Sequence, residues 1–409
     1  MALAPTEEIE AAERIDFHQV HDEYLATIWK ESLFEVIAKL PQGLRKRLSS
    51  IALDGTSASV LACDAALEPL HAPLLYNDSR ASVEAERIRA IAGPEHTAAS
   101  ASSGLAKVLW LQAQPTIPAP RFFLNQADWL TALLSGRPGR SDYHNALKLG
   151  FDVEARRWPA WLGQLTRLDR LPQVVAPGSD IGPIDRAQAN RLGIPHDCLI
   201  RAGTTDSIAA FLAAGVNRPG EAVTSLGTTL VLKLLSEQRV ESARYGVYSH
   251  WFGRYWLAGG ASNAGGAVLR QFFDDAELVA LSTEIDPQAD SGLDYYPLPR
   301  PGERFPVNDP ALSPRLEPRP KSQHQFLHGL LEGLARIEAQ GYARLAELGA
   351  TPLTGVVSAG GGARNTTYNQ IRQRRLKVPV TAAPQQEAAF GSARLALHGT
   401  RLFHLQSQA

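Results

Sequence analysis

The order of hydrophobic and polar residues predicts strands and helices that alternate along the chain. Between His21 and Leu40, hydrophobic residues recur every three or four positions, which is the pattern of an amphipathic helix, and Pro41 and Gly43 end it. Shorter hydrophobic runs bounded by Gly, Asp and Thr are typical of buried strands. The predicted strands cover residues 50–53, 58–63, 198–202, 221–226, 230–234, 255–258 and 355–359, and the further helices cover 207–214, 323–348, a segment after Asn365 and 387–397. This alternation in both halves predicts an α/β fold.

The length of the chain favours two domains. With 409 residues it exceeds the size at which a single core usually stops growing. Hydrophobic residues make up 44% and charged residues 20%, which is typical of a folded globular protein. A turn around Pro219 and Gly220 precedes a predicted hairpin, so we place the boundary there, with an N-terminal domain over 1–216 and a C-terminal domain over 217–409.

The charge of the chain argues against nucleic acid as a partner. Forty-one basic side chains are balanced by 42 acidic ones, and binding to a phosphate backbone needs an excess of clustered Lys and Arg. One short basic cluster is present, and we expect it to be a solvent-exposed helix face; it consists of Arg372, Arg374, Arg375 and Lys377.

Cysteine content and hydropathy narrow the expected environment. Cys63 and Cys198 are far apart and form neither a disulfide framework nor a CxxC metal motif, so we predict no metal held by protein side chains alone. The first fourteen residues lack the hydrophobic core of a signal peptide, and no hydrophobic run approaches the roughly 20 residues that a membrane helix needs. We therefore expect a cytoplasmic protein, or one that reaches an organelle through a leader not present in this sequence, without membrane contact. The sequence does not indicate its oligomeric state.

Three glycine-rich segments follow predicted strands and are candidate phosphate-binding turns. Backbone N–H groups at such turns can converge on an anion, and glycine permits the conformations that this needs. The tip of the predicted hairpin, 225–229, reads Ser-Leu-Gly-Thr-Thr, and it can equally be an ordinary hairpin turn. Residues 360–362 are three glycines before a helix, and a flexible connector is the alternative. Residues 259–266 form the third segment, which close helix packing explains equally well.

The candidate catalytic side chain is Asp206. It lies in the segment Gly-Thr-Thr-Asp-Ser (203–207), where a hydrophobic strand meets the start of a helix. An Asp at this place can simply be a helix N-cap. It can also act as a general base that accepts the proton of a substrate hydroxyl during attack on a phosphorus atom.

Taken together, these segments resemble the FGGY carbohydrate kinases. Residues 54–57 (Asp-Gly-Thr-Ser), 76–78 (Tyr-Asn-Asp), 203–206, 225–229 and 359–362 occur in the order of that family, and the likeness runs from about Glu13 onward. Each motif alone is weak, but their order is specific. Residues 141–150 and 292–298 are similar, more narrowly, to the xylulokinase-like D-ribulose kinases of cyanobacteria and plants.

The resemblance implies an actin-like fold, in which two ribonuclease-H-like domains close over ATP and a sugar at a central cleft. It implies ATP and Mg²⁺ as cofactors and a small-molecule sugar as the partner. Asp206 would be the catalytic base and a substrate contact, and Ser57 would touch the sugar. The residues that it implies for nucleotide binding are Gly227, Thr228, Thr229, Gly260, Gly266, Gly360, Gly361, Gly362 and Asn365.

One departure from the family concerns the N-terminal region. Family members open with a β-hairpin whose tip reads Asp-x-Gly-Thr and supplies a carboxylate to the Mg²⁺–phosphate site. Residues 54–57 do not correspond to this tip, because they follow the first helix. We therefore expect the first hairpin of the N-terminal domain to be missing, with the chain joining the fold at a third strand over 14–17 and leaving strand edges exposed.

Three functional hypotheses follow. The first is a pentulose kinase that converts ATP and D-ribulose to ADP and D-ribulose 5-phosphate. D-xylulose is the competing candidate substrate, and glycerol is less favoured than either. The second is a catalytically silent protein that binds sugar or nucleotide, because the Asp-x-Gly-Thr hairpin is not found. The third, an actin-like ATPase or chaperone, is disfavoured by the segments 76–78 and 142–150, which resemble sugar kinases.

Overall fold

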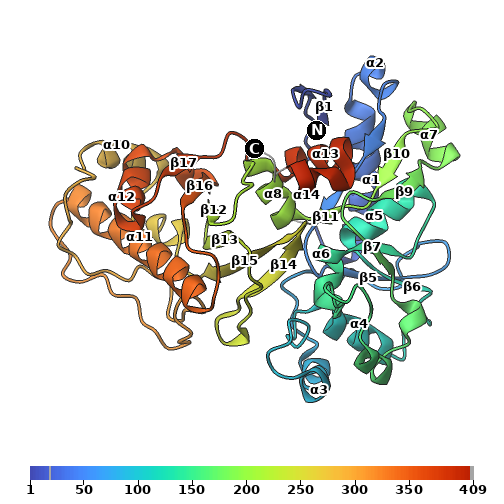
Figure 1. The fold of residues 1–409 in the computed structure, drawn as a ribbon, viewed down its shortest axis with the longest axis horizontal. Helices are drawn as coiled ribbons and strands as arrows, with labels where there is room; N and C mark the ends of the chain where they lie inside the picture. Colours follow the sequence, from blue (N-terminus) through green and yellow to red (C-terminus); the bar gives the residue numbers. More distant parts are fainter. Residues whose placement is uncertain (18–19, 406–409) are drawn as a thin grey trace. The chain divides into compact units, whose positions relative to one another are not determined.

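The chain folds into two compact units, seen in a computed structural model that describes residues 1–17 and 20–405 (Figure 1). Unit 1 comprises Met1–Ala213 and Glu387–Ala409, and unit 2 comprises Ala214–Gln386. We expected a single boundary after residue 216. The chain instead passes between the units twice, because the last predicted helix packs against strands of unit 1.

Unit 1 is built from short strands of two to four residues. Its three-stranded sheet has the order β3-β10-β9, in which β3 (Ser50–Ile51) is parallel to β10 (Leu199–Arg201), and β10 is antiparallel to β9 (Asp180–Pro183). Beyond β3, β4 (Asp54–Gly55) pairs in parallel with β11 (Thr204–Thr205). The other strand pairs are β1 (Ala2–Leu3) with β2 (Ile9–Ala11), β5 (Val60–Cys63) with β6 (Phe122–Asn125), and β7 (Arg140–Asp142) with β8 (Gln173–Val175).

These pairings correct two local predictions. We expected residues 54–57 to turn the chain between two adjacent strands. Asp54 and Gly55 instead belong to β4, and β5 pairs with β6, so the strands on the two sides of the turn have different partners. Residues 14–17 form no strand, whereas the acidic segment before them contains the β1–β2 pair. Pairing partners that are distant in sequence decide both outcomes, and local hydrophobic runs do not reveal them.

Helices cover the strands of unit 1 and complete its core. Helix α1 (Leu25–Lys39) buries Trp29, Leu33, Phe34 and Ile37, the face that its periodicity predicts. Helix α13 (Ala388–His398) packs against β3 and β4. The other helices are α2 (Gln42–Arg45), α3 (Ser82–Ala92), α4 (Gly104–Ala113), α5 (Gln126–Ser135), α6 (Tyr143–Ala146), α7 (Arg186–Leu192), α8 (Asp206–Ala214) and α14 (Leu402–Leu405), with 3₁₀ turns at Asp22–Tyr24, Leu147–Leu149, Ala160–Gln164, Leu168–Arg170 and Gly399–Arg401.

Unit 2 is organised around one six-stranded sheet with the order β14-β15-β13-β12-β16-β17. The predicted hairpin is confirmed: β12 (Glu221–Leu226) pairs antiparallel with β13 (Leu230–Ser236). On its other side, β12 is parallel to β16 (Gly355–Ala359). The remaining strands are β14 (Tyr248–Phe252), β15 (Tyr255–Ser262) and β17 (Val380–Ala382).

Helices of unit 2 bury the sheet and support the glycine-rich segments. The 25-residue helix α11 (Gln323–Glu347) confirms the predicted 323–348 helix and packs against the sheet and against α12 (Thr366–Leu376). Figure 1 shows α11, α12 and α10 (Asp275–Thr283) as neighbours. The remaining helical segments are α9 (Gly266–Leu269) and the 3₁₀ turns Ala243–Tyr245 and Gly361–Arg364.

The basic cluster on α12 is not the solvent-exposed face that we expected. Arg372 is fully buried and forms an ion pair with the fully buried Glu338 of α11 (Nε–Oε2 2.6 Å). Arg374 and Arg375 pair with Glu332 of the same helix. Because their partners lie more than thirty residues away in sequence, the local pattern of α12 could not reveal them.

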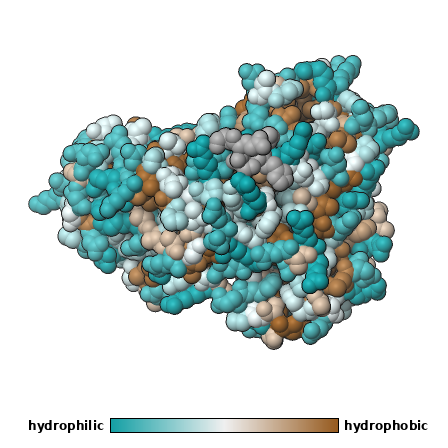
Figure 2. Space-filling view, viewed as in Figure 1, coloured by the Kyte–Doolittle hydropathy of each residue, from teal (hydrophilic) through white to brown (hydrophobic). Residues whose placement is uncertain are grey.

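Hydrophilic residues cover most of the molecular face in Figure 2, and smaller hydrophobic patches interrupt them. Among the described residues, no helix combines the length and the hydrophobicity needed to cross a bilayer. Neither Cys63 nor Cys198 forms a disulfide, and both are buried.

Candidate functional site

A cavity of about 630 Å³ in unit 2 gathers most of the predicted nucleotide residues. Its walls come from the β12–β13 hairpin, the start of α9, helix α10 and the segment between β16 and α12. Six predicted residues line it: Gly227, Thr228, Gly266, Gly361, Gly362 and Asn365. Thr229, Gly260 and Gly360 are not among the lining residues.

Two of the glycine segments meet backbone to backbone at the hairpin tip. The N–H of Gly266 donates to the carbonyl of Gly227 (2.8 Å), and the N–H of Ala267 donates to that of Thr228 (3.1 Å). A Cβ on Gly265 would lie 2.6 Å from the Thr228 carbonyl oxygen, and a Cβ on Gly266 would lie 2.8 Å from that of Gly227. Any side chain at these two positions would therefore separate the segments and open this wall of the cavity.

The segment of three consecutive glycines at 360–362 forms another part of the cavity wall. Gly360 has φ +84°, and a Cβ there would lie 2.8 Å from the carbonyl oxygen of Leu226, so the turn needs glycine to approach β12. At Gly361, by contrast, a Cβ would meet no atom within 4 Å, which leaves the backbone open to the cavity. Gly360 thus supports the turn, whereas Gly361 faces the space itself.

Asn365 connects the glycine segment and the start of α12 to helix α10. Its side-chain oxygen caps α12 by accepting the N–H of Tyr368 (2.9 Å), and its amide donates to the hydroxyl of Ser282 in α10 (2.7 Å). The first turn of α12 therefore begins at the cavity with a fixed orientation. A helix start of this kind favours anions, because its N–H groups have no partners within the helix.

Gly260 belongs to the hydrophobic packing of unit 2. It lies within β15, where it pairs with Leu232, so the expected glycine turn at 259–260 is a continuous strand. A Cβ on Gly260 would lie 2.8 Å from the buried ring of Phe305. The structure thus gives this glycine a packing role, and the nucleotide role expected for it has no support from the cavity.

The sequence analysis missed the part of the cavity that comes from α10 and from two arginines. Leu278 and Val279 of α10 line it, and Val279 is 70% exposed. Arg270 and Arg364 line it too. No motif marks these residues, because a hydrophobic helix side and single arginines are common everywhere. The cavity therefore combines glycine backbone and cationic groups with a hydrophobic side, a combination that can hold a phosphate chain beside a flat ring.

A cluster of buried polar side chains connects β12, β16, α11 and α12 by hydrogen bonds. Arg372 binds both carboxylate oxygens of Glu338 (2.6 and 2.7 Å) and donates to the hydroxyl of Ser358 in β16 (2.6 Å). Glu338 also accepts the hydroxyl proton of Thr224 in β12 (2.6 Å). The two strands that lead into the glycine turns are thus linked to α11 and α12 by charge-assisted hydrogen bonds.

Unit 1 places Asp206 as the first residue of α8, directly after β11. One carboxylate oxygen accepts the N–H of Ser207 (2.6 Å). In the parallel pair β4–β11, Gly55 is opposite Thr205. Ser57 and Asp206 follow these residues in the chain, so both lie just beyond the same end of the two strands. The structure therefore brings the two predicted sugar-side residues to one end of two adjacent strands.

Asp54 of β4 is a neighbouring carboxylate that the sequence analysis did not single out. It accepts a hydrogen bond from Ser392 of α13 (2.6 Å). Burial raises the pKa of the Asp54 carboxyl, and the charge of Asp206 adds to this, whereas the Ser392 hydrogen bond opposes it. The raised pKa means that Asp54 holds its proton more readily than an exposed carboxyl group does.

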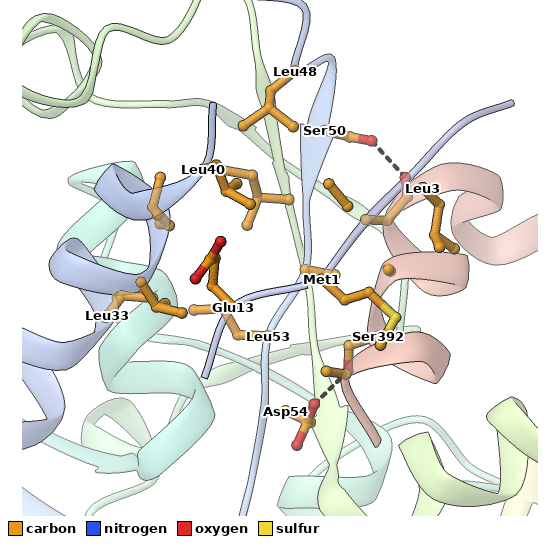
Figure 3. Close-up of a pocket in the computed structure, with 18 of the residues that line it drawn as sticks. Met1, Leu3, Glu13, Leu33, Leu40, Leu48, Ser50, Leu53, Asp54 and Ser392 are labelled. Atoms are coloured by element: carbon orange, nitrogen blue, oxygen red, sulfur yellow. Dashed lines mark hydrogen bonds between the residues drawn. The ribbon is translucent and has the colours of Figure 1, made fainter. Parts of the chain in front are cut away.

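Asp54 and Ser392 also lie on a largely hydrophobic cavity of about 600 Å³ within unit 1 (Figure 3). Its lining includes residues 1–5, β3 and β4, and parts of α1 and α13. Strand β3 pairs with β10, and β4 pairs with β11. Residues of β3 and β4, but not of β10 or β11, line the cavity.

Two further carboxyl groups, of Asp128 and Asp142, are buried in unit 1. Asp128 of α5 accepts hydrogen bonds from Asn125 (2.8 Å) and Ser141 (2.7 Å), and Asp142 accepts from Asn145 (2.6 Å). Burial raises the pKa of Asp128 to about 8 and that of Asp142 to about 6, and the charge of Asp142 adds to the shift of Asp128. These groups belong to the scaffold that precedes β11.

Neither unit offers a ready-made metal site in its described residues. No three His, Cys, Asp or Glu side chains there come together in a way that could hold an ion. Mg²⁺ at phosphoryl-transfer sites is usually bound by one or two carboxylates together with substrate phosphates.

Comparison with known proteins identifies the family. Residues 222–400, which contain the glycine-lined cavity, match the FGGY family of carbohydrate kinases, C-terminal domain. This region is an FGGY kinase domain. A xylulose kinase of Staphylococcus epidermidis is 25% identical over 421 aligned residues, covering 96% of this chain and 83% of that protein. Residues 222–400 thus match the C-terminal domain of FGGY carbohydrate kinases, and the chain is similar to a xylulose kinase over nearly all of its length.

The chain is also similar to a ribulokinase and to a sugar kinase of known structure. A ribulokinase of Shouchella clausii is 29% identical over 134 residues, covering 31% of this chain and 24% of that protein. The crystal structure of a xylulose kinase from Brucella ovis superimposes with a TM-score of 0.77 at 24% identity, covering 88% of this chain and 78% of that one. This structural similarity confirms the predicted two-domain actin-like α/β fold.

Proposed function

We propose that this FGGY kinase transfers the γ-phosphoryl group of ATP to a pentulose, and that the pentulose is D-ribulose. The observation that carries the proposal is the cavity of unit 2, where Gly227, Thr228 and Gly361 offer backbone and hydroxyl groups beside the capped start of α12. This arrangement suits the phosphates of a nucleotide, and the hydrophobic side of α10 suits its base.

In the proposed reaction, the primary hydroxyl oxygen O5 of the sugar attacks the γ-phosphorus of ATP. The bond between that phosphorus and the β–γ bridging oxygen breaks, and ADP leaves with the electron pair. The proton of the sugar hydroxyl passes to the carboxylate of Asp206, which acts as the general base. Ser57 contacts the sugar, and its position at the end of β4, beside the strand that leads to Asp206, supports this role.

Thr228 meets the phosphates of ATP in this proposal, and Asn365 orients the start of α12 towards them. Thr229 does not line the cavity and is given no such contact. Phosphoryl transfer depends on positioning and on neutralising charge. Mg²⁺, when bound with ATP, would supply part of that neutralisation. Arg270 and Arg364, which line the same cavity, would supply cationic charge from the chain itself.

The choice of D-ribulose rests on the segments 141–150 and 292–298, which resemble D-ribulose kinases. D-xylulose is the alternative pentulose and has equal support, because the chain is similar both to proteins named xylulose kinase and to one named ribulokinase. Steady-state assays of ADP release with D-ribulose, D-xylulose and glycerol discriminate between them. We expect the highest kcat/KM with D-ribulose, and a preference for D-xylulose would overturn the substrate but not the reaction.

The catalytic role is tested by Asp206→Asn. This change removes the proton acceptor and keeps the shape of the side chain, so we expect turnover to fall by roughly 10²–10⁴ with little change in ATP affinity. Retained turnover would remove Asp206 from the mechanism. Calorimetry with ATP–Mg²⁺ and with D-ribulose provides the control, because binding of either ligand without turnover in the wild-type chain would identify a silent binding protein.

A further inference from the structure

A lysine side chain is buried beside the turn that carries Ser57. Lys107 of α4 has no exposed surface. Its ammonium donates to the carbonyl oxygens of Ala58 (2.8 Å) and Leu75 (2.6 Å). Burial lowers the pKa of Lys107 to about 8; the charge of Lys148 adds to this, and that of Asp78 opposes it. A buried ammonium is costly, so a position that retains one needs a structural or functional reason.

The acceptor at Ala58 lies in a strained part of the backbone. Ala58 is buried and has φ +61°, a left-handed conformation that a residue with a Cβ adopts only at a cost in free energy. Such a conformation persists when surrounding contacts determine it. The ammonium of Lys107, held against the Ala58 carbonyl, is one of these contacts.

Other hydrogen bonds fix the rest of this turn, residues 56–59. The Oε1 atom of Gln126 accepts the N–H of Thr56 (2.9 Å), and the hydroxyls of Thr56 and Ser59 are 2.6 Å apart. The Ser59 hydroxyl also accepts the N–H of Tyr76 (3.1 Å). Lys107 joins the same two segments, since Leu75 precedes Tyr76. The turn is therefore held from three sides.

The hydroxyl of Ser57 is the exception within this turn. Its oxygen is buried and has no hydrogen-bond partner among the described residues. A buried hydroxyl without a protein partner is uncommon, and a bound ligand or an ordered water can supply the missing hydrogen bond. Hydrogen bonds at Thr56, Ala58 and Ser59 thus constrain the backbone on both sides of Ser57, whose own hydroxyl has no hydrogen-bond partner within the described residues.

We propose that Lys107 is a positioning residue, which holds the turn 56–59 so that the Ser57 hydroxyl is oriented towards the sugar. This inference rests on the proposed function, because the sugar is its ligand. Lys107 itself is too deeply buried to touch the substrate. Its effect is therefore expected on sugar binding, while nucleotide binding in unit 2 is unaffected.

Lys107→Met, which keeps the length of the side chain and removes its donors, tests this role. We expect the KM for the pentulose to rise by roughly 10- to 100-fold, the loss expected for charge-assisted hydrogen bonds, while the KM for ATP stays within about twofold. Lys39→Met removes an exposed lysine of the same unit and should change neither value. An unchanged pentulose KM in Lys107→Met, or an equal rise in both KM values, overturns the proposal.

The wild-type chain provides a second test that does not depend on how the variant folds. Asp78 and Lys148 are the charged groups that act on Lys107. As pH rises through about 8, Lys107 loses its charge, and the pentulose KM should rise several-fold while the ATP KM does not. A flat pentulose KM between pH 7 and 9 counts against the role.

Amide hydrogen exchange separates this proposal from the proposed function. If the wild-type chain phosphorylates no pentulose, the proposed function fails. The Lys107 proposal is then decided by the amides of residues 56–59, measured without sugar. Faster exchange in Lys107→Met than in Lys39→Met supports the positioning role, and equal exchange overturns it.

Discussion

The buried ion pair between Arg372 and Glu338 gives the sharpest stability prediction. Both side chains are fully buried, and Arg372 makes two hydrogen bonds to Glu338 and one each to Ser358 and Asn369. Arg372→Met removes the cation and leaves the Glu338 carboxylate buried without compensation. Removal of one partner of such a pair typically costs about 3–5 kcal/mol. We expect a loss of this size in the unfolding free energy of unit 2.

Two further variants separate the charge effect from simple loss of packing. Arg375 lies on the same helix, and its partner Glu332 also pairs with Arg374. Because Glu332 keeps Arg374 as a partner, we expect Arg375→Met to lower the unfolding free energy by only about 1 kcal/mol. The double variant Arg372→Met, Glu338→Met leaves no buried charge. It should be more stable than Arg372→Met alone, because replacing both partners by hydrophobic residues is often close to neutral.

The assay is hydrogen exchange of β12, β16 and α12 amides in increasing urea. It reports on unit 2 directly, whereas two units with separate cores need not unfold in one transition. Amides of β5 and β6 in unit 1 serve as an internal reference. A cost below about 1 kcal/mol for Arg372→Met, or a double variant less stable than the single one, would refute this reasoning.

Two other predictions concern the cavity and pH. Gly361→Leu should fill the open space beside this glycine and raise the ATP dissociation constant by roughly tenfold or more in calorimetry, whereas Gly163→Leu, equally open but in unit 1, should not. The raised pKa of Asp128, about 8, means that folded unit 1 binds an extra proton between that pH and the ordinary value near 4. Its stability should therefore fall as pH rises from about 4 to 8, and an increase in melting temperature over this range would contradict the assignment.

The local sequence was sufficient where neighbouring residues determine the structure. The hairpin around Gly227 and Thr228 combines two hydrophobic strands with a glycine tip, and the helix after Asn365 begins with a capping side chain. The open backbone at Gly361 follows from three glycines at the end of a strand. These features carry their own short-range signals, and each occurs where it was predicted.

The sequence was insufficient where residues far apart in the chain meet. Gly260 has the appearance of a turn glycine, but within β15 it pairs with Leu232, and a Cβ there would lie 2.8 Å from the ring of Phe305. Arg372 has the pattern of an exposed helix, yet it pairs with a carboxylate 34 residues earlier. Lys107 carries no motif, because its acceptors are backbone carbonyls at Ala58 and Leu75. Pairings of this kind depend on the folded chain.

The return of α13 to unit 1 constrains how the chain can be made. Ser392 binds Asp54, and the hydroxyl of Ser50 donates to the carbonyl of Ala396 (2.7 Å), so α13 completes the packing of strands formed hundreds of residues earlier. On the ribosome, all of unit 2 emerges before α13 does. Unit 2 can therefore reach its native fold during synthesis, whereas unit 1 must wait, with β3 and β4 uncovered, until α13 has been released.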